Sequence, residues 1–251
     1  MLEEESRIQD VYKRRRNEKS KLYSWFSEGH LFWFQELERE LLCLLRDHDI
    51  DTLEAKAILD IGCGSGQWIH EFLKLGATPE KMTGIDLLDW RIEVARRTCP
   101  ATVRLECGNA ERLGFPDRSF DLISQFTVFS SVLDANLKRK MASEMLRVLK
   151  EDGFILWYDF FMRDPRNKDV RGITKREISE LFPGCRVAVR RVSVAIPLVR
   201  LIAPHSWAIC YLLEKVRVLN THYLGLISRE PVRDWRRRCF ITPDSAVDDA
   251  A

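Results

Sequence analysis

Three glycines at alternate positions follow a short apolar run, and they constrain the fold more than any other part of the sequence. The run is Ala57–Ile61, and the glycines are Gly62, Gly64 and Gly66. Glycine has no Cβ, so the backbone here can turn sharply and approach a ligand closely. The next stretch, Gln67–Leu75, predicts a helix whose N-terminal amides point at the same place. The pattern therefore predicts a strand, a tight turn and a helix that together surround a ligand.

An acidic residue stands where a second strand is predicted to end. Asp86 lies 20 residues after Gly66, at the end of the apolar run Met82–Asp86. In doubly wound sheets a carboxylate at this place accepts hydrogen bonds from ribose hydroxyls. A dinucleotide fingerprint read from Gly62 would need a further glycine where Gln67 stands, and no phosphate-binding Gly-Lys-Ser/Thr sequence follows. We therefore expect a cofactor that carries adenosine but no pyrophosphate.

Apolar runs alternate with amphipathic stretches along the rest of the chain, as in βα units around a parallel sheet. Further strands are predicted over Val103–Cys107, Ser119–Phe126, Phe154–Asp159, Arg186–Ala195 and Tyr223–Ser228. Further helices are predicted over Trp90–Arg97, Asp134–Lys150 and Thr174–Phe182, with a helical stripe over Leu31–Arg46 before the sheet and a helical insertion over Leu198–Leu219 before the last strand.

The segment from Ala57 to Asp159 resembles the class I S-adenosylmethionine-dependent methyltransferases of the type 11 subfamily. Asp60 through Gly66 match the first motif of that family, and Asp86 matches its ribose-binding acid. Asn109 stands where the family usually has an aspartate that binds the adenine amino group, and its carbonyl can still accept a hydrogen bond. The resemblance, together with the place of Gln125 at the end of the fourth strand, suggests a set of residues that bind S-adenosylmethionine: Asp60, Gly62, Cys63, Gly64, Gly66, Asp86, Leu87, Asn109, Ala110 and Gln125.

The resemblance also implies the architecture. It is a doubly wound, Rossmann-like α/β fold with a seven-stranded, mostly parallel sheet and an antiparallel last strand. We expect an N-terminal helical cover over residues 1–50 and a methyltransferase domain over residues 51–230, with the helical insertion at 198–219. A basic and then acidic tail occupies residues 231–251.

Methyl transfer from a sulfonium depends mainly on alignment of the reacting groups and exclusion of water. A general base is needed only for a poor nucleophile such as a hydroxyl. The candidates for that role are Asp159, at the end of the fifth strand, and His222, just before the last strand, with His30 in the helical cover as a further option. The seven cysteines have no metal-ligand spacing, so no metal is expected.

The acceptor is predicted from weaker signals. The sequence after the fourth strand, Gln125-Phe-Thr-Val, lacks the Asn/Asp-Pro-Pro-aromatic run of nucleic-acid base methyltransferases, so no nucleic-acid partner is expected. A looser resemblance to methyltransferases of polysaccharide assembly implies O-methylation of a sugar hydroxyl on a bacterial glycan, lipo-oligosaccharide or glycolipid precursor. Residues 186–240 contain 11 lysines and arginines against 3 acidic residues, which suits an anionic acceptor.

Two other hypotheses remain open. A quinone, a polyketide or another small aromatic acceptor would be bound by the aromatic cluster Tyr23, Trp25, Phe26, Phe32 and Trp33. A non-catalytic scaffold that merely binds the cofactor is the third hypothesis, and the complete glycine turn and Asp86 argue against it.

One apolar segment raises the question of a membrane. Residues 192–213 are largely apolar over the length of a bilayer span, but they include Arg200 near the middle. A central arginine costs about 3 kcal/mol on insertion scales, so a spanning helix is not expected. Peripheral membrane association through this segment remains an option. The charged N-terminal residues do not look like a signal peptide, which predicts a cytoplasmic protein.

Overall fold

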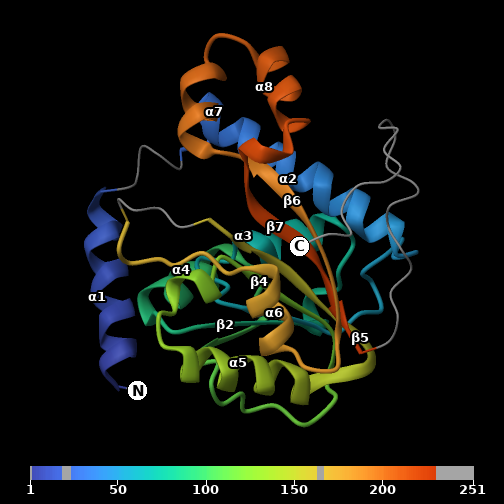
Figure 1. Ribbon diagram of the computed structural model, residues 1–251. Helices are drawn as coiled ribbons and strands as arrows, with labels where there is room; N and C mark the ends of the chain where they lie inside the picture. The colour runs from blue at the N-terminus through green and yellow to red at the C-terminus, as the bar shows by residue number, and fades with distance from the viewer. Residues whose placement is uncertain (1, 19–23, 163–166, 230–251) are drawn as a thin grey trace.

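Seven strands form one sheet across the middle of the protein (Figure 1). The computed structural model describes residues 2–18, 24–162 and 167–229. The strands are β1 (Ile58–Ile61), β2 (Met82–Asp86), β3 (Arg104–Cys107), β4 (Phe120–Phe126), β5 (Leu149–Phe160), β6 (Arg186–Val194) and β7 (Asn220–Ser228). Their order is β3-β2-β1-β4-β5-β7-β6. Strands β1 to β5 are parallel, and β7 is antiparallel to both β5 and β6. The predicted fold class is therefore confirmed.

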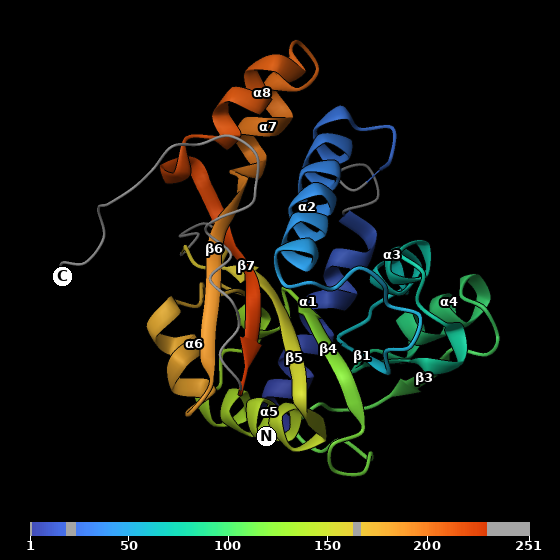
Figure 2. The same cartoon turned by 90° about the vertical axis from the view of Figure 1, so that its right-hand side faces the viewer.

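Helices cover both faces of this sheet (Figure 2). They are α1 (Leu2–Glu18), α2 (Glu28–Asp47), α3 (Gln67–Lys74), α4 (Asp89–Thr98), α5 (Ala135–Val148), α6 (Lys175–Leu181), α7 (Ile196–Ile202) and α8 (Trp207–Glu214), with short 3₁₀ turns η1 (Pro79–Lys81), η2 (Phe129–Ser131) and η3 (Arg217–Leu219). The apolar faces of α2, α3 and α4 pack on one side of the sheet, and those of α5 and α6 pack on the other. Alternate residues of each strand point to opposite faces, so Leu122 belongs to the first of these cores and Ile123 to the second.

The predicted helical insertion contains two helices, α7 and α8. α7 ends at Ile202 and α8 begins at Trp207, because Pro204 cannot continue a helix and Ser206 caps the next one by accepting the N–H of Ile209. This helical hairpin packs on α2. A Cβ at Gly29 would lie 2.8 Å from the Cα of Arg200, so only glycine allows the approach.

The last strand is longer than the sequence predicts. β7 begins at Asn220, so His222 lies within the strand and not before it. Asn220 and His222 occupy buried positions of the alternating pattern, where apolar residues are expected. Because both residues are polar, the hydrophobic pattern did not indicate the start of the strand.

The N-terminal helix α1 is a separate element that the apolar pattern did not reveal. Its residues are mostly charged, and Ile8 and Val11 are its buried apolar side chains among those described. Of the predicted tail, residues 231–251 lie outside the described residues. Within the described part of the chain, no helix is both long enough and apolar enough to cross a membrane.

Candidate functional site

The glycine turn after β1 presents bare main chain to a cavity. Gly62, Gly64 and Gly66 all adopt positive φ, at 68°, 57° and 87°. This left-handed conformation favours glycine because other residues suffer a clash of the Cβ. The N–H groups of Gly62 and Cys63 donate to the carbonyl of Ile85, at 2.7 and 3.0 Å, and so tie the turn to β2. The turn is therefore held in place beside the next strand.

Asp86 closes the turn from the side of β2. One carboxylate oxygen accepts the N–H of Gly64 at 2.9 Å, and the other accepts the N–H of Leu88 at 2.8 Å. Burial raises the pKa of Asp86, while the Arg91 guanidinium, 4.0 Å away, and these N–H groups act in the opposite direction. The carboxylate is thus buried, oriented and directed at the cavity.

Asn109 follows β3 on the next strand outward. Its Oδ1 accepts the N–H of Glu111 at 2.9 Å, and its Nδ2 donates to Oε1 of Glu5 on α1 at 2.6 Å. Leu87 and Ala110 lie beside it on the cavity wall. The side-chain amide therefore has a fixed orientation, with its donor turned toward the N-terminal helix.

These residues surround one end of a cavity of about 550 Å³ at the carboxyl edge of the parallel strands. That volume is in the range of small-molecule and cofactor sites. Of the predicted cofactor-binding residues, the cavity brings together Gly62, Cys63, Gly64, Asp86, Leu87, Asn109 and Ala110. Exposed glycine backbone, a buried carboxylate and sufficient volume fit an adenosine-bearing cofactor.

Three of the predicted cofactor-binding residues lie behind the cavity wall. Asp60 accepts the hydroxyl of Ser124 at 2.7 Å, and burial raises its pKa to about 7. Its second oxygen has no hydrogen-bond partner among the described residues. Gly66 allows close packing, because a Cβ there would meet the Cys99 sulfur at 2.5 Å. Gln125 accepts the N–H of Val128 at 3.1 Å and so fixes the turn after β4.

Aromatic side chains line the other end of the cavity. They come from α2, α3, β4 and β5, and they are Trp33, Trp68, Phe126, Tyr158 and Phe160. The rings of Trp68 and Phe126 are stacked, with centroids 3.6 Å apart and planes 8° apart. The Tyr158 hydroxyl contacts Nε1 of Trp33 at 3.2 Å and the Ser193 hydroxyl at 2.9 Å. This end therefore has flat, rigid apolar walls.

His30 lies at this aromatic end. It lines the cavity from the first turn of α2, and its ring stacks on Trp33 with centroids 5.7 Å apart. Burial lowers the pKa of His30, and the charge of Arg200 lowers it further. The imidazole is therefore predominantly neutral at pH 7.

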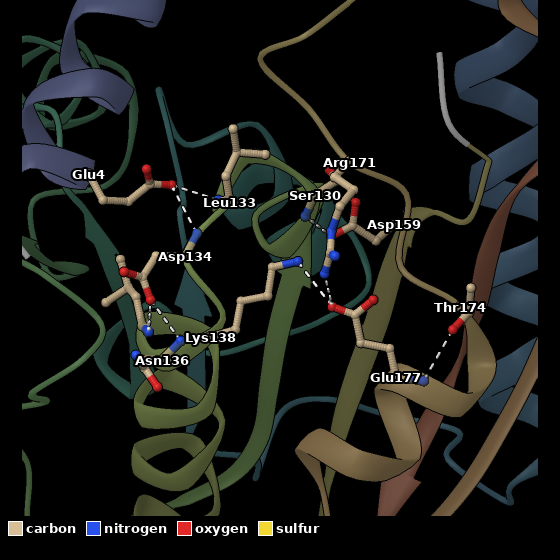
Figure 3. Close-up of polar contacts among 11 residues, drawn as sticks. Glu4, Ser130, Leu133, Asp134, Asn136, Lys138, Asp159, Arg171, Thr174 and Glu177 are labelled. Atoms are coloured by element: carbon tan, nitrogen blue, oxygen red, sulfur yellow. Dashed lines mark hydrogen bonds and ion pairs between the residues drawn. The ribbon is translucent and has the colours of Figure 1, made fainter. Parts of the chain in front are cut away.

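Asp159 lies behind the wall, in the polar cluster shown in Figure 3. It is fully buried, and its carboxylate accepts the N–H groups of Ser130 at 3.0 Å and Phe160 at 2.9 Å. Burial raises its pKa to about 6. Ser130 lines the cavity and Asp159 does not. Asp159 therefore contributes to the cavity only by positioning the η2 turn, through its hydrogen bond with Ser130.

An ion pair between a buried lysine and a half-buried glutamate lies close to the same turn. Lys138 of α5 is 1% exposed and contacts Glu177 of α6 at 3.2 Å (Figure 3). Arg171 also binds Glu177, and its backbone N–H donates to the carbonyl of Ser130 at 2.8 Å. The pair thus connects two helices to the η2 turn.

His222 is also away from the cavity wall. It is 1% exposed, and its ring stacks on Tyr158 with centroids 4.7 Å apart. Burial lowers the pKa of His222 to about 3, so the ring is neutral. Its Nδ1 contacts the Thr221 hydroxyl at 2.9 Å. The histidine therefore supports the aromatic wall from behind.

Sequence reasoning missed several residues that line the cavity, including Glu5, Tyr12, Trp68, Tyr158 and Phe160. Trp68 follows the glycine turn by two residues, and Tyr158 and Phe160 flank Asp159 at the end of β5. Their positions at strand and helix ends were a usable signal. Glu5 and Tyr12 carried no such signal, because their helix reaches the cavity through long-range contacts.

Comparison with known proteins agrees with the geometry. Residues 58–153 match the family model described as a methyltransferase domain. An uncharacterized methyltransferase, YcgJ of Bacillus subtilis, is 35% identical over 119 residues, 45% of each chain. A demethylmenaquinone methyltransferase of Symbiobacterium thermophilum is 35% identical over 101 residues, 38% of this chain and 39% of that one. The chain thus matches less than half the length of these curated relatives.

Solved structures agree on the fold. A crystal structure of an S-adenosylmethionine-dependent methyltransferase from Thermotoga maritima superposes with a TM-score of 0.59 and 17% identity, over 89% of this chain and 100% of that one. The crystal structure of YcgJ superposes with a TM-score of 0.51 and 20% identity, over 76% of this chain and 100% of that one. The sheet, the glycine turn and the matched segment together identify residues 58–153 as a methyltransferase domain.

Proposed function

We propose that the protein transfers a methyl group from S-adenosylmethionine to a small aromatic acceptor. The observation that carries this proposal is the composition of the cavity, which joins a glycine-and-carboxylate end to an end walled by aromatic rings. A ligand bound at one end would meet a ligand bound at the other within one cavity. Such proximity is the main catalytic requirement of methyl transfer.

Residues of the turn and of β2 would hold the cofactor. The main chain of Gly62 to Gly64 would lie against its amino-acid part, and Asp86 would accept hydrogen bonds from the ribose hydroxyls. The cofactor supplies an activated methyl group on a sulfonium. The protein's own contribution is to orient the two ligands and to exclude water with the aromatic walls.

The lining favours an aromatic acceptor over a sugar. Sugar hydroxyls taken from water need hydrogen-bond partners inside the site. Among the described lining residues the carboxylates are Glu5 and Asp86, and both lie at the cofactor end. The lining hydroxyls of Thr127, Ser130 and Ser131 already donate to backbone carbonyls. Flat rings such as Trp33 and Phe126 instead suit stacking on another ring. The name of the Symbiobacterium relative, a demethylmenaquinone methyltransferase, agrees with an acceptor of this class.

His30 is the residue that we assign as general base for a phenolic hydroxyl. It lines the acceptor end, and its lowered pKa leaves the imidazole able to accept a proton at pH 7. Asp159 and His222 lie behind the cavity wall, so we assign them supporting roles: Asp159 positions the η2 turn, and His222 supports the ring of Tyr158.

A methyl-transfer assay with hydroquinones, catechols and nucleotide sugars tests this proposal. We expect transfer to the phenols and none to the sugars. His30→Gln should lower kcat by about 100-fold, in the range of general-base effects, and leave binding of S-adenosylhomocysteine unchanged. His205→Gln changes an exposed histidine of the helical hairpin and should have no effect. Transfer to sugars alone would return the acceptor to the glycan class. Cofactor binding without any transfer would favour the scaffold hypothesis.

We also propose that the helical hairpin α7–α8 associates peripherally with an anionic membrane. The exposed apolar side chains of the hairpin and of the segment that follows it are Leu201, Ile209, Tyr211, Leu212, Val216 and Val218. Between residues 195 and 219 the sole acid is Glu214, which is paired with Arg39 at 2.7 Å, whereas Lys215 and Arg217 are exposed. The exposed Glu28 of α2 accepts the indole N–H of Trp207 at 2.9 Å, but the hairpin itself contributes apolar side chains and cations, which suit an anionic bilayer.

Co-sedimentation with vesicles tests this association. Vesicles containing phosphatidylglycerol should retain the protein, phosphatidylcholine vesicles should retain less, and Leu212→Ser should reduce retention. A dimer in solution that Leu212→Ser dissociates, without vesicle binding, would overturn the proposal.

A further inference from the structure

The N-terminal helix α1 forms part of the wall at the cofactor end of the cavity. Glu5, Ile8 and Tyr12 line it from one face of this helix. In Figure 1 the helix runs along the outside of the sheet, on the side of α4. The cofactor end is thus bounded by the sheet edge on one side and by α1 on the other.

Polar contacts fix α1 in this place. Glu4 accepts the N–H of Leu133 at 2.6 Å, as Figure 3 shows, and Arg7 donates to the carbonyl of Ser131 at 2.6 Å. Burial by itself would raise the pKa of Glu4, but hydrogen bonds from Arg7 and the backbone outweigh it and lower the pKa. The hydroxyl of Tyr12 lies 3.1 Å from that of Ser131. These contacts fix which side chains of α1 face the cavity.

In this position of α1, Glu5 lies beside Asn109. The amide of Asn109 is fixed by the N–H of Glu111 on its oxygen side, so its Nδ2 is directed at Oε1 of Glu5 at 2.6 Å. No hydrogen bond to Oε2 of Glu5 is seen among the described residues. The Glu5 carboxylate is thus oriented by one hydrogen bond at the cavity, and its second oxygen can accept another.

The order of strands at the sheet edge indicates which part of the cofactor would lie there. The glycine turn follows β1, Asp86 ends β2, and Asn109 comes two residues after Cys107, the register partner of Asp86 on β3. With the ribose at Asp86 and the amino-acid part at the glycine turn, the base extends toward β3. An adenine carries an amino group with two N–H donors, and such donors need acceptors in a partly buried site.

We propose that Glu5 is the residue that accepts a hydrogen bond from the adenine amino group, and that Asn109 is a positioning residue that orients it. This inference rests on the proposed function, since it assumes that the cavity binds the adenosine of the cofactor. It makes α1 a part of the cofactor site, with a carboxylate supplied from a distant segment of the chain. It also makes the site selective for a base with a donor at position 6.

Calorimetric titration with two nucleosides tests the inference. The probes are S-adenosylhomocysteine and its 6-oxo analogue, S-inosylhomocysteine, which has an acceptor where adenine has a donor. The wild type should prefer the first by about 100-fold, because a carboxylate would repel the 6-oxo group. Glu5→Gln should weaken S-adenosylhomocysteine binding about tenfold and reduce the preference to less than about tenfold, since a carboxamide can donate to the 6-oxo group.

Matched variants separate the possible outcomes. The carboxamide in Glu5→Gln can still accept from Asn109, so α1 should remain docked, and the melting temperature checks this. Glu3→Gln changes an exposed acid of the same helix and should keep the wild-type preference. Asp86→Ala should weaken both nucleosides by about 100-fold and equally, because both carry the ribose.

If Glu5→Gln keeps the same preference as Glu3→Gln, while the wild type binds both nucleosides and Asp86→Ala binds them about 100-fold more weakly, the inference alone is overturned. A wild type that binds neither nucleoside overturns the proposed function together with the inference.

Discussion

The two ends of the cavity are built in different ways. The cofactor end is mostly main chain and two carboxylates, Glu5 and Asp86, and apart from α1 it is drawn largely from residues 61–110, in which neighbouring strands follow one another along the sequence. The acceptor end is made of side chains from α2, α3, β4 and β5, which are far apart in the sequence. A backbone site can be recognised from a short motif, whereas a site of assembled side chains requires the tertiary structure.

The sharpest test of this contrast uses two glycines with positive φ. A Cβ at Gly62, φ 68°, would lie 2.4 Å from Cγ2 of Val128, whereas a Cβ at Gly76, φ 88°, would meet no atom within 4 Å. Gly62→Ala should therefore lower the free energy of unfolding by about 4 kcal/mol, from backbone strain and overpacking together. Gly76→Ala should cost about 1 kcal/mol, from strain alone. Urea denaturation measures both.

Binding adds a second measurement to the same pair of variants. Gly62→Ala should also weaken S-adenosylhomocysteine, because the altered residue lines the cavity, while Gly76→Ala should leave its affinity unchanged. Equal losses of stability in the two variants would mean that the turn after β1 has no special need for glycine. The conformation of the cofactor end would then not depend on glycine at this turn.

The same contrast explains what the sequence could predict. The strands β1 to β5 were predictable because their apolar runs and intervening amphipathic helices are local patterns that indicate a parallel α/β sheet, whereas the seven-stranded sheet with an antiparallel last strand was implied by the family resemblance. The turn and Asp86 were recognisable because glycine spacing and a strand end are also local. The contact of Asn109 with Glu5 spans 104 residues, and that of Leu133 with Glu4 spans 129. No periodicity records such contacts, so the part played by α1 required the structure.

The candidate bases illustrate the same limit. A position at the end of β5 suggested that Asp159 faces an acceptor, but the burial of its side chain depends on the η2 turn that folds over it. His222 seemed to precede a strand, because the buried polar residues Asn220 and His222 interrupt the apolar pattern of β7. His30 lines the cavity because the hairpin α7–α8 holds the start of α2 in place, through contacts such as that of Phe32 with Trp207.

A smaller effect concerns the acceptor end: a buried carboxyl group behind its wall should make the free energy of unfolding depend on pH. Glu36 of α2 is 2% exposed, and one of its oxygens accepts the N–H of Ser193 at 2.7 Å. Burial raises its pKa to about 8, and the nearby carboxylates of Glu214 and Glu40 contribute. Ser193 in turn contacts the hydroxyl of Tyr158, which lines the cavity. Ionisation of Glu36 should therefore alter the hydrogen bonds through which Ser193 positions Tyr158 in the aromatic wall.

The sign of the effect follows from proton binding. Between pH 4.5 and about 8 the unfolded chain loses the proton of Glu36 while the folded chain retains it, so stability falls as pH rises through this window. Asp60 and Asp159, with pKa values raised to about 7 and about 6, act in the same direction in every variant. Glu36→Gln removes only the pH dependence that the carboxyl group of Glu36 contributes. Relative to the wild type, its free energy of unfolding should therefore increase by about 2 kcal/mol between pH 5.5 and pH 7.5.

Urea denaturation at the two pH values measures this difference, and Glu38→Gln, on the same helix but paired with Lys74 at the surface, provides the control. If Glu36→Gln and the wild type lose stability in parallel, Glu36 is ionised in the folded protein and the acceptor end holds a buried charge. If they diverge as expected, the buried carboxyl is neutral at neutral pH. The aromatic wall of the acceptor end would then depend on the protonation of a carboxyl group behind it, whereas the turn at the cofactor end depends first on the positive φ angles of its glycines.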